Sequence, residues 1–249
     1  MDLADELDIP AYATLLWRGE AEIRPGPKRS LDMHALAQAG IRLADAAGLD
    51  SVSMRTVSAE MGMTSMALYR YVKSKQELLL MMVDEALGPP PAPGPGAGQD
   101  WRAGLTIWAQ ANRERLRAHP WVLAVPVAES AILPYQVQWM ERGLDALAGT
   151  ALGERQKLSA LLLVNVYVRG QTQLALGFET GAGGRSGVEA GLLFGRRLLA
   201  LTDPVRYPRV TAAMNHNPAA DYDSDFGTDE FNFGLETVFD GIQALIARR

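Results

Sequence analysis

The segment SMRTVSAEMGMTSMALYRYVKSKQELL, residues 53–79, carries the clearest structural pattern in the chain. Met54, Val57 and Met61 recur at the spacing of one apolar helix face. Gly62 follows at once, where a helix end commonly needs a residue with positive φ. The pattern predicts a short helix that ends in a tight glycine turn.

A second short helix is expected directly after this turn. Thr64 and Ser65 are suited to cap its first N–H groups. Leu68 and Val72, four residues apart, predict an inward face, which leaves polar and aromatic side chains outside. Residues 74–77, Ser-Lys-Gln-Glu, form a capping box that opens a third helix. Two short helices around a glycine turn indicate a helix-turn-helix, whose second helix enters the DNA major groove.

The local charge agrees with a DNA-binding surface. Within residues 53–75, four cationic side chains face one carboxylate, a balance of about +3. They are Arg55, Arg70, Lys73 and Lys75 against Glu60. Phosphate contacts need such a basic patch, and the net charge of −5 on the whole chain does not oppose it, because distant charges are screened.

The same segment resembles the tetracycline-repressor (TetR) family of bacterial transcription regulators. The matching pieces are residues 53–62, the run Leu-Tyr-Arg-Tyr-Val at 68–72 and the run Lys-Ser-Lys-Gln-Glu-Leu-Leu at 73–79. Residues 231–242 also resemble the last helix of the family's C-terminal domain. The resemblance implies an all-α homodimer, with an N-terminal three-helix DNA-binding domain and a larger helical domain that binds an effector and dimerises.

By this resemblance, nine residues occupy DNA-facing positions: Arg55, Thr64, Ser65, Met66, Ala67, Tyr69, Arg70, Tyr71 and Lys75. Arg70 is the best candidate for a base contact, since a guanidinium can grip a guanine edge with two bonds. Arg55 and Lys75 are better suited to phosphate. Met66 and Ala67 fit a thymine methyl group, whereas packing within the domain is an equal alternative for Tyr71.

Composition bounds the class of protein. The chain has 249 residues, 48% of them hydrophobic, so a sizeable core can form. It has no cysteine, which excludes disulfides and thiolate chemistry and fits a cytoplasmic location. The first residues are acidic where a signal peptide would be basic, and no apolar run reaches a membrane span. We therefore expect no membrane association.

Proline and glycine suggest where the domains divide. We predict an N-terminal extension at 1–29, the DNA-binding domain at 30–88, a Pro/Gly linker at 89–99 and the effector-binding and dimerisation domain at 100–249. The extension ends in a basic stretch in which Lys28 and Arg29 form a candidate DNA arm, with a solvated linker as the alternative. Its apolar residues from Ile9 to Trp17 suggest a short helix docked on the body, or a tail.

The remaining chain shows helical periodicity. Helices are predicted at 31–47, 75–87, 101–116, 135–147, 155–178, 188–201 and 231–247, with a loop at 202–227. The helix at 155–178 is apolar almost all round, which predicts a buried central helix. Together with the apolar stripe of 231–246 it suggests a four-helix dimer seam, unless that stripe is buried within its own subunit.

Aromatic and amide side chains of this half are candidates for an effector pocket: Trp108, Trp121, Tyr135, Trp139, Asn165, Tyr167, Gln171 and Phe178. Aromatic walls with a few polar groups are typical of small-molecule sites. The alternative is that the aromatics are ordinary core and that Asn165 bonds across the dimer seam.

Catalysis is poorly supported. His34, His119 and His216 lie in unrelated regions without metal-ligand spacing, and no nucleophile motif occurs, so we expect no enzyme, cofactor or metal. The predicted function is a dimeric repressor that binds double-stranded palindromic DNA and is released by a small hydrophobic or aromatic effector. An effector-independent regulator or an activator is the alternative.

Overall fold

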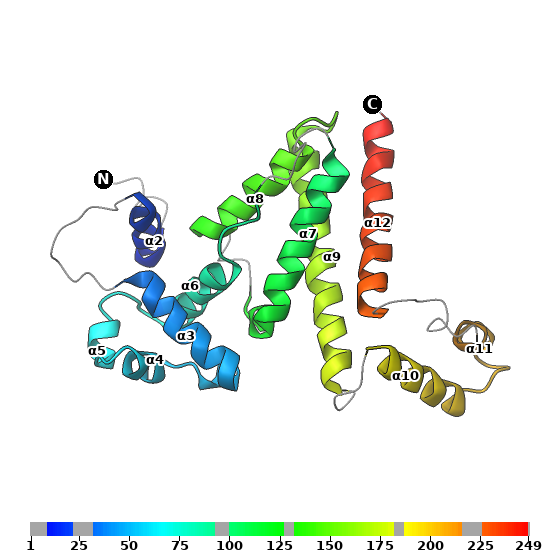
Figure 1. The fold of residues 1–249 in the computed structure, drawn as a ribbon, viewed down its shortest axis with the longest axis horizontal. Helices are drawn as coiled ribbons and strands as arrows, with labels where there is room; N and C mark the ends of the chain where they lie inside the picture. Colours follow the sequence, from blue (N-terminus) through cyan, green and yellow to red (C-terminus); the bar gives the residue numbers. More distant parts are fainter. Residues whose placement is uncertain are drawn as a thin grey trace. The chain divides into compact units, whose positions relative to one another are not determined.

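The computed structural model describes residues 9–21, 32–92, 100–126, 132–181, 187–215 and 226–248. All regular structure in these residues is helical, as predicted, with eleven α-helices and two 3-10 helices (Figure 1). The chain forms two compact units, Met1–Gly149 and Thr150–Arg249. The predicted linker at 89–99 thus falls inside the first unit, and its residues 93–99 lie outside the described residues.

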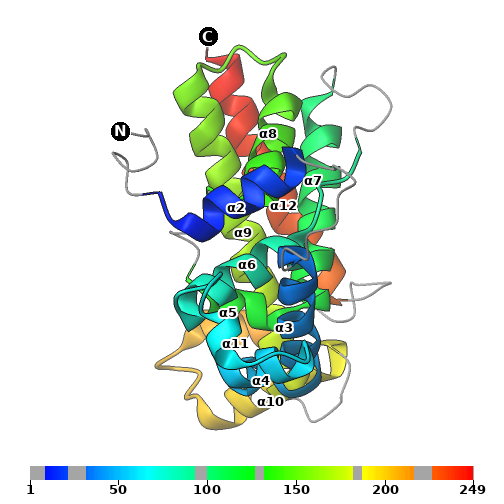
Figure 2. The same ribbon diagram turned by 90° about the vertical axis from the view of Figure 1, so that its left-hand side faces the viewer.

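The N-terminal helices of the first unit form a small bundle (Figure 2). It contains α3 (Met33–Ala47), α4 (Met54–Glu60), α5 (Ser65–Leu68) and α6 (Lys75–Leu87), with η1 (Leu49–Ser51) between the first two. The long helices α3 and α6 pack against each other, and α4 contacts both α3 and α5. Helices α3, α4 and α5 are the predicted three-helix unit around a helix-turn-helix, and α6 is the helix predicted to follow it.

Helix α3 begins two residues later than predicted, because Asp32 supplies its cap. The Asp32 carboxylate accepts hydrogen bonds from the backbone N–H groups of His34, at 2.9 Å, and Ala35, at 3.3 Å. Its last residues, Ala46 and Ala47, are exposed. The buried positions are Leu36, Ala37, Ala39, Gly40, Ile41 and Ala44.

Helix α6 has the predicted bounds. The Ser74 hydroxyl accepts from the Glu77 N–H at 3.1 Å, as a capping residue should. The Glu77 carboxylate, however, accepts from the N–H of Lys73 rather than from that of Ser74, so the reciprocal half of the predicted capping box is displaced by one residue. Gly88, at φ +57°, ends the helix.

Three further helices complete the first unit. Helices α7 (Trp101–Ala118) and α8 (Pro134–Leu147) pack on each other and both contact α6, and η2 (Pro120–Ala124) follows α7. Helix α2 (Ala11–Ala21) buries its residues Tyr12, Ala13 and Leu16, while Trp17, predicted to share that face, is exposed and donates its indole N–H to the Ile132 carbonyl at 2.8 Å.

The second unit is built on two long helices that run side by side, α9 (Glu154–Gly181) and α12 (Phe226–Ala247) (Figure 1). Four apolar residues of α12 are almost fully buried: Phe231, Leu235, Phe239 and Ile242. The stripe predicted at 231–246 is thus buried mainly within its own chain, which is the alternative to its burial in a dimer seam. The Tyr167 hydroxyl of α9 donates to the carbonyls of Glu230 and Phe231, at 3.1 and 2.9 Å. A Cβ on Gly234 would collide with the Tyr167 ring, so glycine there permits this close approach.

Two predictions about the second unit are wrong. Helix α9 is not buried all round within one chain, since Leu162 and Val166 are 62% and 59% exposed. The predicted loop at 202–227 contains a helix, α11 (Pro208–Asn215), which follows α10 (Gly187–Leu201). Periodicity over eight residues was too short to outweigh the surrounding Asp, Asn and Pro.

Candidate nucleic-acid interface

The helix-turn-helix is held in shape by its own short-range hydrogen bonds. Ser53 caps α4, its hydroxyl accepting from the Thr56 N–H at 3.1 Å while the Thr56 hydroxyl accepts from the Ser53 N–H at 2.9 Å. Gly62 adopts φ +66° in the turn, as predicted. The Thr64 hydroxyl accepts from the Ala67 N–H at 3.3 Å and so caps α5.

Two anchors set the orientation of α5. Leu68 and Val72 are fully buried, as their spacing predicts. The hydroxyls of Ser58 on α4 and Ser65 on α5 lie 3.0 Å apart and share a hydrogen bond. Ser58 is buried and Ser65 is half-buried, so this bond ties the two helices at a partly buried point. The outer side of α5 is therefore presented in one orientation.

The side chains predicted to face DNA lie on the accessible side of this unit. Met66 is 77% exposed, although it is a large apolar residue. The exposed members of the set are Arg55, Thr64, Met66, Tyr69, Arg70 and Lys75, and the half-buried members are Ser65, Ala67 and Tyr71. The surface offers a guanidinium, hydroxyls, a phenol and a thioether within a few residues, which can serve both base edges and phosphates.

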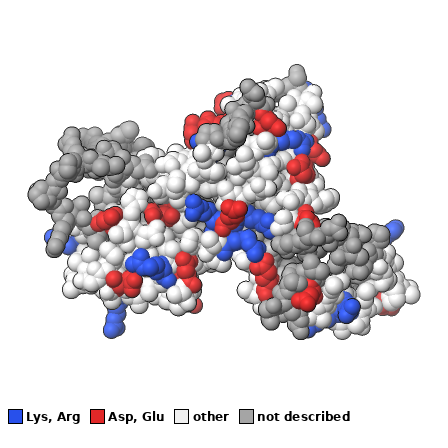
Figure 3. Space-filling model, in the orientation of Figure 1, with Lys and Arg blue, Asp and Glu red and all other residues white. Residues whose placement is uncertain are grey.

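The charge of this surface is shaped by its carboxylates. Glu60 accepts a bond from Arg42 at 3.3 Å, so the one acidic residue inside the helix-turn-helix already has a cationic neighbour. Glu77 is directed to the backbone of Lys73. The face drawn in Figure 3 carries basic and acidic side chains interspersed, consistent with a local rather than a global basic field.

The candidate DNA arm, Lys28 and Arg29, lies outside the described residues. His34, in the first turn of α3, is engaged inside the protein. Its ring Nδ1 lies 2.7 Å from the Glu85 carboxylate. That hydrogen bond raises the pKa of His34 above its ordinary value of 6.5, against a smaller opposing effect of partial burial. His34 is thus tied to α6.

Helix α3 is also bound at its other end to the residues that follow α7. The Asp45 carboxylate lies 2.9 Å from Nδ1 of His119 and accepts the indole N–H of Trp121 at 2.7 Å. Trp121 is buried, and its donor is satisfied by this bond. The sequence did not reveal this link, because nothing in it relates residue 45 to residues 119–121.

Helix α8 is attached to α6 by two further links that sequence analysis missed. The Asp84 carboxylate accepts from the backbone N–H groups of Tyr135 and Gln136, at 3.2 and 2.9 Å. The Trp139 indole donates to the Gly88 carbonyl at 2.9 Å. A signal was present, since Asp84 interrupts the apolar run of residues 78–87.

The eight effector-pocket candidates are divided between the two units, with four in each. In the first unit, the rings of Trp108 and Trp139 meet edge to face at 5.6 Å, and Trp108 donates to the Trp139 carbonyl at 2.8 Å. Both are buried with their donors satisfied, as core tryptophans are. Tyr135 is half-buried, with its ring centroid 6.3 Å from that of His34.

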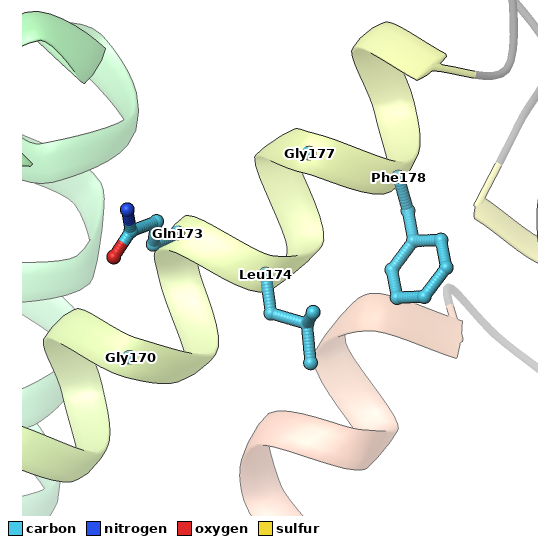
Figure 4. A pocket seen from close by; sticks show the side chains of 5 residues that line it. All are labelled: Gly170, Gln173, Leu174, Gly177 and Phe178. Atoms are coloured by element: carbon cyan, nitrogen blue, oxygen red, sulfur yellow. The ribbon is translucent and has the colours of Figure 1, made fainter.

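In the second unit, Tyr167 is committed to α12, and Gln171 donates to the Gly227 carbonyl at 3.3 Å while its buried side-chain oxygen has no partner. Asn165 is half-buried. Phe178 meets Phe194 edge to face at 6.2 Å. Phe178 also lines a hollow of about 390 Å³ on α9, in which Leu174 projects on the same side (Figure 4). Gly170, Gln173 and Gly177 complete its wall.

The described residues contain neither a metal-binding cluster nor a membrane-spanning helix. No group of three or more His, Cys, Asp or Glu side chains among them is arranged to hold a metal ion. None of their helices combines the length and the apolar character that crossing a bilayer requires.

Two family models match the chain. Residues 36–82 match "Bacterial regulatory proteins, tetR family", and residues 92–246 match "Tetracyclin repressor-like, C-terminal domain". A curated relative, the HTH-type transcriptional repressor DrrR1 of Streptomyces coeruleorubidus, is 33% identical over 246 residues, which cover 97% of this chain and 88% of the relative.

Solved structures with the same fold come from Streptomyces coelicolor. The TetR family protein ActR in complex with actinorhodin has a TM-score of 0.71 at 20% identity, covering 88% of this chain and 98% of that one. A possible TetR family transcriptional regulator of strain A3(2) has a TM-score of 0.67 at 26% identity, covering 86% and 100%.

Proposed function

The chain belongs to the TetR family of bacterial transcription regulators, and on that basis we propose that it is a dimeric repressor that a small hydrophobic or aromatic molecule releases from a palindromic operator. The family and its relatives are transcription regulators and not enzymes, which confirms the prediction that the chain is not an enzyme. The observation that carries the proposal is the outer face of α5, exposed and fixed on two buried anchors. Such a regulator works in the cytoplasm, where its DNA is.

In this proposal Arg70 reads a base, and Arg55 and Lys75 hold phosphates. Arg70 lies just beyond α5 and is exposed. Lys75 begins α6, so the positive end of that helix adds to its attraction for phosphate. Ser65, Met66, Ala67 and Tyr69 complete the readout from α5 and its end, with Thr64 and Tyr71 at the edge.

DNA titrations of two variants separate these roles. We expect Arg70→Ala to lose about 1–3 kcal/mol on the preferred sequence and to relax the preference at one base step. Lys75→Ala should weaken binding to all sequences alike and reduce the salt dependence by about one unit of slope per subunit, or about two for the dimer. Arg196→Ala, an exposed arginine on α10, is the control. Equal losses on every DNA from Arg70→Ala would contradict its base contact.

The proposed dimer uses the exposed apolar face of α9 and two exposed apolar residues of α12. On α9, Leu158, Leu162 and Val166 recur every four residues and are all exposed. On α12, Phe233 is 71% exposed and Leu245 42% exposed. An exposed apolar stripe such as that of α9 is typical of interfaces. Two copies would form a four-helix seam.

Sedimentation of single variants tests the dimer. Leu162→Glu places a charge in the centre of the stripe and should convert a dimer into a monomer. Leu201→Glu, on a leucine of α10 that is more exposed still, should leave the dimer intact. A monomeric wild type at micromolar concentration would contradict the proposed assembly.

The effector is proposed to be hydrophobic or aromatic. ActR, a structural relative, was solved in complex with actinorhodin. In this chain the hollow beside Phe178 falls within the usual range of ligand-site volumes, about 300–1,000 Å³. An effector that binds one arrangement of the DNA-binding helices better than another lowers the occupancy of DNA by shifting populations.

Release of a fluorescent operator fragment tests this part. We expect some planar aromatic compounds in a panel to release the fragment from the wild type, and Phe178→Ala to change the concentration required. Leu201→Ala, at an exposed leucine of α10 outside the hollow, is the control. Release by no compound would favour the effector-independent regulator.

A further inference from the structure

Two adjacent carboxylates of α6, Asp84 and Glu85, are bound to different helices. Asp84 is directed at the start of α8, and Glu85 is directed at α3. Helix α3 is the helix on which the helix-turn-helix packs, whereas α8 belongs to the part matched by the C-terminal family model. The pair therefore stands where those two parts of the chain meet, inside one compact unit.

The Asp84 carboxylate caps the N-terminus of α8, which has no capping side chain of its own. Helix α8 begins after Leu133, which provides no side-chain cap, and its first residue is Pro134. The next two N–H groups, those of Tyr135 and Gln136, are donated to the two oxygens of Asp84 at 3.2 and 2.9 Å. Asp84 is only 3% exposed, so its carboxylate and the first N–H groups of α8 satisfy one another.

The Glu85 carboxylate contacts α3 at two consecutive turns. One carboxylate oxygen accepts from the Gln38 amide at 2.8 Å, and the other lies 2.7 Å from Nδ1 of His34. The His34 ring in turn lies 6.3 Å from the ring of Tyr135, one of the two residues whose N–H Asp84 accepts. The contacts thus close a ring that runs from α8 through Asp84 and Glu85 to α3, and back to α8.

The turn that carries the pair has little freedom to absorb a displacement. Four residues after Asp84, the Gly88 carbonyl accepts the Trp139 indole N–H, so α8 holds α6 at a second point. The residues from Leu78 to Val83 are buried against their neighbours. Hydrogen bonds are directional, and a helix bound at two points moves as a unit or breaks a bond.

We propose that Asp84 and Glu85 form a two-sided positioning element that couples the first turn of α8 to α3. Its role in regulation rests on the function proposed above: a molecule that moves the start of α8 would shift α3, and DNA binding would alter α8 by the same coupling. Neither residue touches DNA in this account. They set the placement of the helices that do.

Amide hydrogen exchange in the free, full-length protein tests the coupling. Asp84→Asn keeps the size of the side chain but replaces one acceptor oxygen by a donor. We expect exchange to rise at least threefold at Tyr135 and Gln136, and also at residues 35–38 of α3, which Asp84 does not touch. Asp145→Asn, the same change at an exposed site on α8, should alter neither segment. A rise confined to α8 overturns the proposal.

The reciprocal variant guards against a general loss of stability. Gln38 is exposed, so Gln38→Ala removes one bond to Glu85 without opening the core. It should raise exchange at Tyr135 and Gln136 at least twofold, while Gln110→Ala, at an exposed glutamine of α7, does not. If Asp84→Asn raises exchange in α12 as much as in α3, the variant has lowered the stability of the whole protein. The Gln38→Ala variant is then decisive, and unchanged exchange at Tyr135 and Gln136 in that variant overturns the proposal.

Exchange measured with a selected DNA fragment separates this proposal from the function on which it rests. Bound DNA should slow exchange at Tyr135 and Gln136 in the wild type, and Asp84→Asn should bind the same fragment without that change. DNA binding with no response at α8 in the wild type overturns the regulatory role. Failure to select any DNA overturns the proposed function. The coupling in the free protein is tested independently of DNA, by amide exchange in Asp84→Asn and Gln38→Ala.

Discussion

The α6–α8 contact and the α9–α12 contact hold helices together by different physical means. Between α6 and α8 the attachments are directional, from Asp84 to two backbone N–H groups and from Trp139 to a carbonyl. Between α9 and α12 a row of buried apolar side chains dominates, with hydrogen bonds from Tyr167 and Gln171 as polar exceptions. Apolar burial stabilises without fixing an angle, whereas hydrogen bonds fix geometry and contribute little net free energy.

The difference suggests a division of labour. A contact that only has to stabilise the fold can be apolar, and the α9–α12 contact suits a permanent association of helices. A contact that has to set the position of one helix relative to another needs directional groups, and α6–α8 lies between the DNA-binding helices and the rest of its unit. Substitutions should therefore cost most free energy in the second unit and change geometry most in the first.

The largest effect is expected from Phe239→Ala in the apolar seam. Phe239 is fully buried, so its truncation should destabilise the fold by about 3–5 kcal/mol through lost burial and the cavity left behind. Phe233→Ala on the same helix is the control, since Phe233 is exposed and should affect only association. Denaturant unfolding measures both. If Phe239→Ala and Phe233→Ala lose similar unfolding free energy in a monomeric background, the apolar contact between α9 and α12 is refuted.

Gly234→Ala should rank second. The added Cβ would enter the space of the Tyr167 ring, and overpacking of this kind costs about 1–3 kcal/mol, here with displacement of the Tyr167 hydroxyl. A Cβ at Gly241, also on α12, meets nothing within 4 Å. Gly241→Ala should thus gain up to about 1 kcal/mol from helix propensity. Thermal unfolding that shows the same sign for both would rule out the close approach.

Trp139→Phe tests the directional contact and should cost less. It removes the donor to the Gly88 carbonyl but keeps an aromatic ring, so the expected net loss is about 0.5–1.5 kcal/mol. Trp17→Phe is matched to it, because Trp17 also donates to a carbonyl but is exposed, where water can replace the bond. A larger loss for Trp17→Phe in urea unfolding would contradict the argument.

The smallest effect is the pH dependence of the His34–Glu85 pair. Because the folded pKa of His34 is raised above 6.5, its protonated form stabilises the fold fully below pH 6.5, and this contribution is lost as the pH rises through the raised value. The His34 side chain is 46% exposed, so screening keeps the effect small. Unfolding of the wild type and of Glu85→Gln, compared on both sides of the transition, should differ more at the acidic end.

Local signals explain what could be predicted from the sequence. The bounds of α6, the positive φ of Gly62 and the burial of Leu68 depend on neighbours within a few residues. The roles of Asp45 and Asp84 depend on partners 51 to 76 positions away, which periodicity does not contain. For Asp84 the sequence did contain a signal, because this aspartate interrupts an apolar run.

The candidate sites divide in the same way. The DNA-facing set lies in one continuous stretch, and its side chains are exposed or half-buried on one small unit, although their contacts with DNA stay a prediction. The pocket candidates have only their residue types in common. They are spread over about 70 residues of the chain and fall in two units. Trp108 and Trp139 proved to be core, whereas the glycines beside Phe178 carried no signal that sequence could detect.

Selection of bound fragments from a random DNA pool by the purified protein tests the central claim most directly. A two-fold regulator should enrich a palindrome with half-sites about 34–36 Å apart or a multiple of that distance, and Arg70→Ala should lose the preference at one symmetric base step. No enrichment at low salt, or an enriched site without two-fold symmetry, would contradict a dimeric sequence-specific repressor.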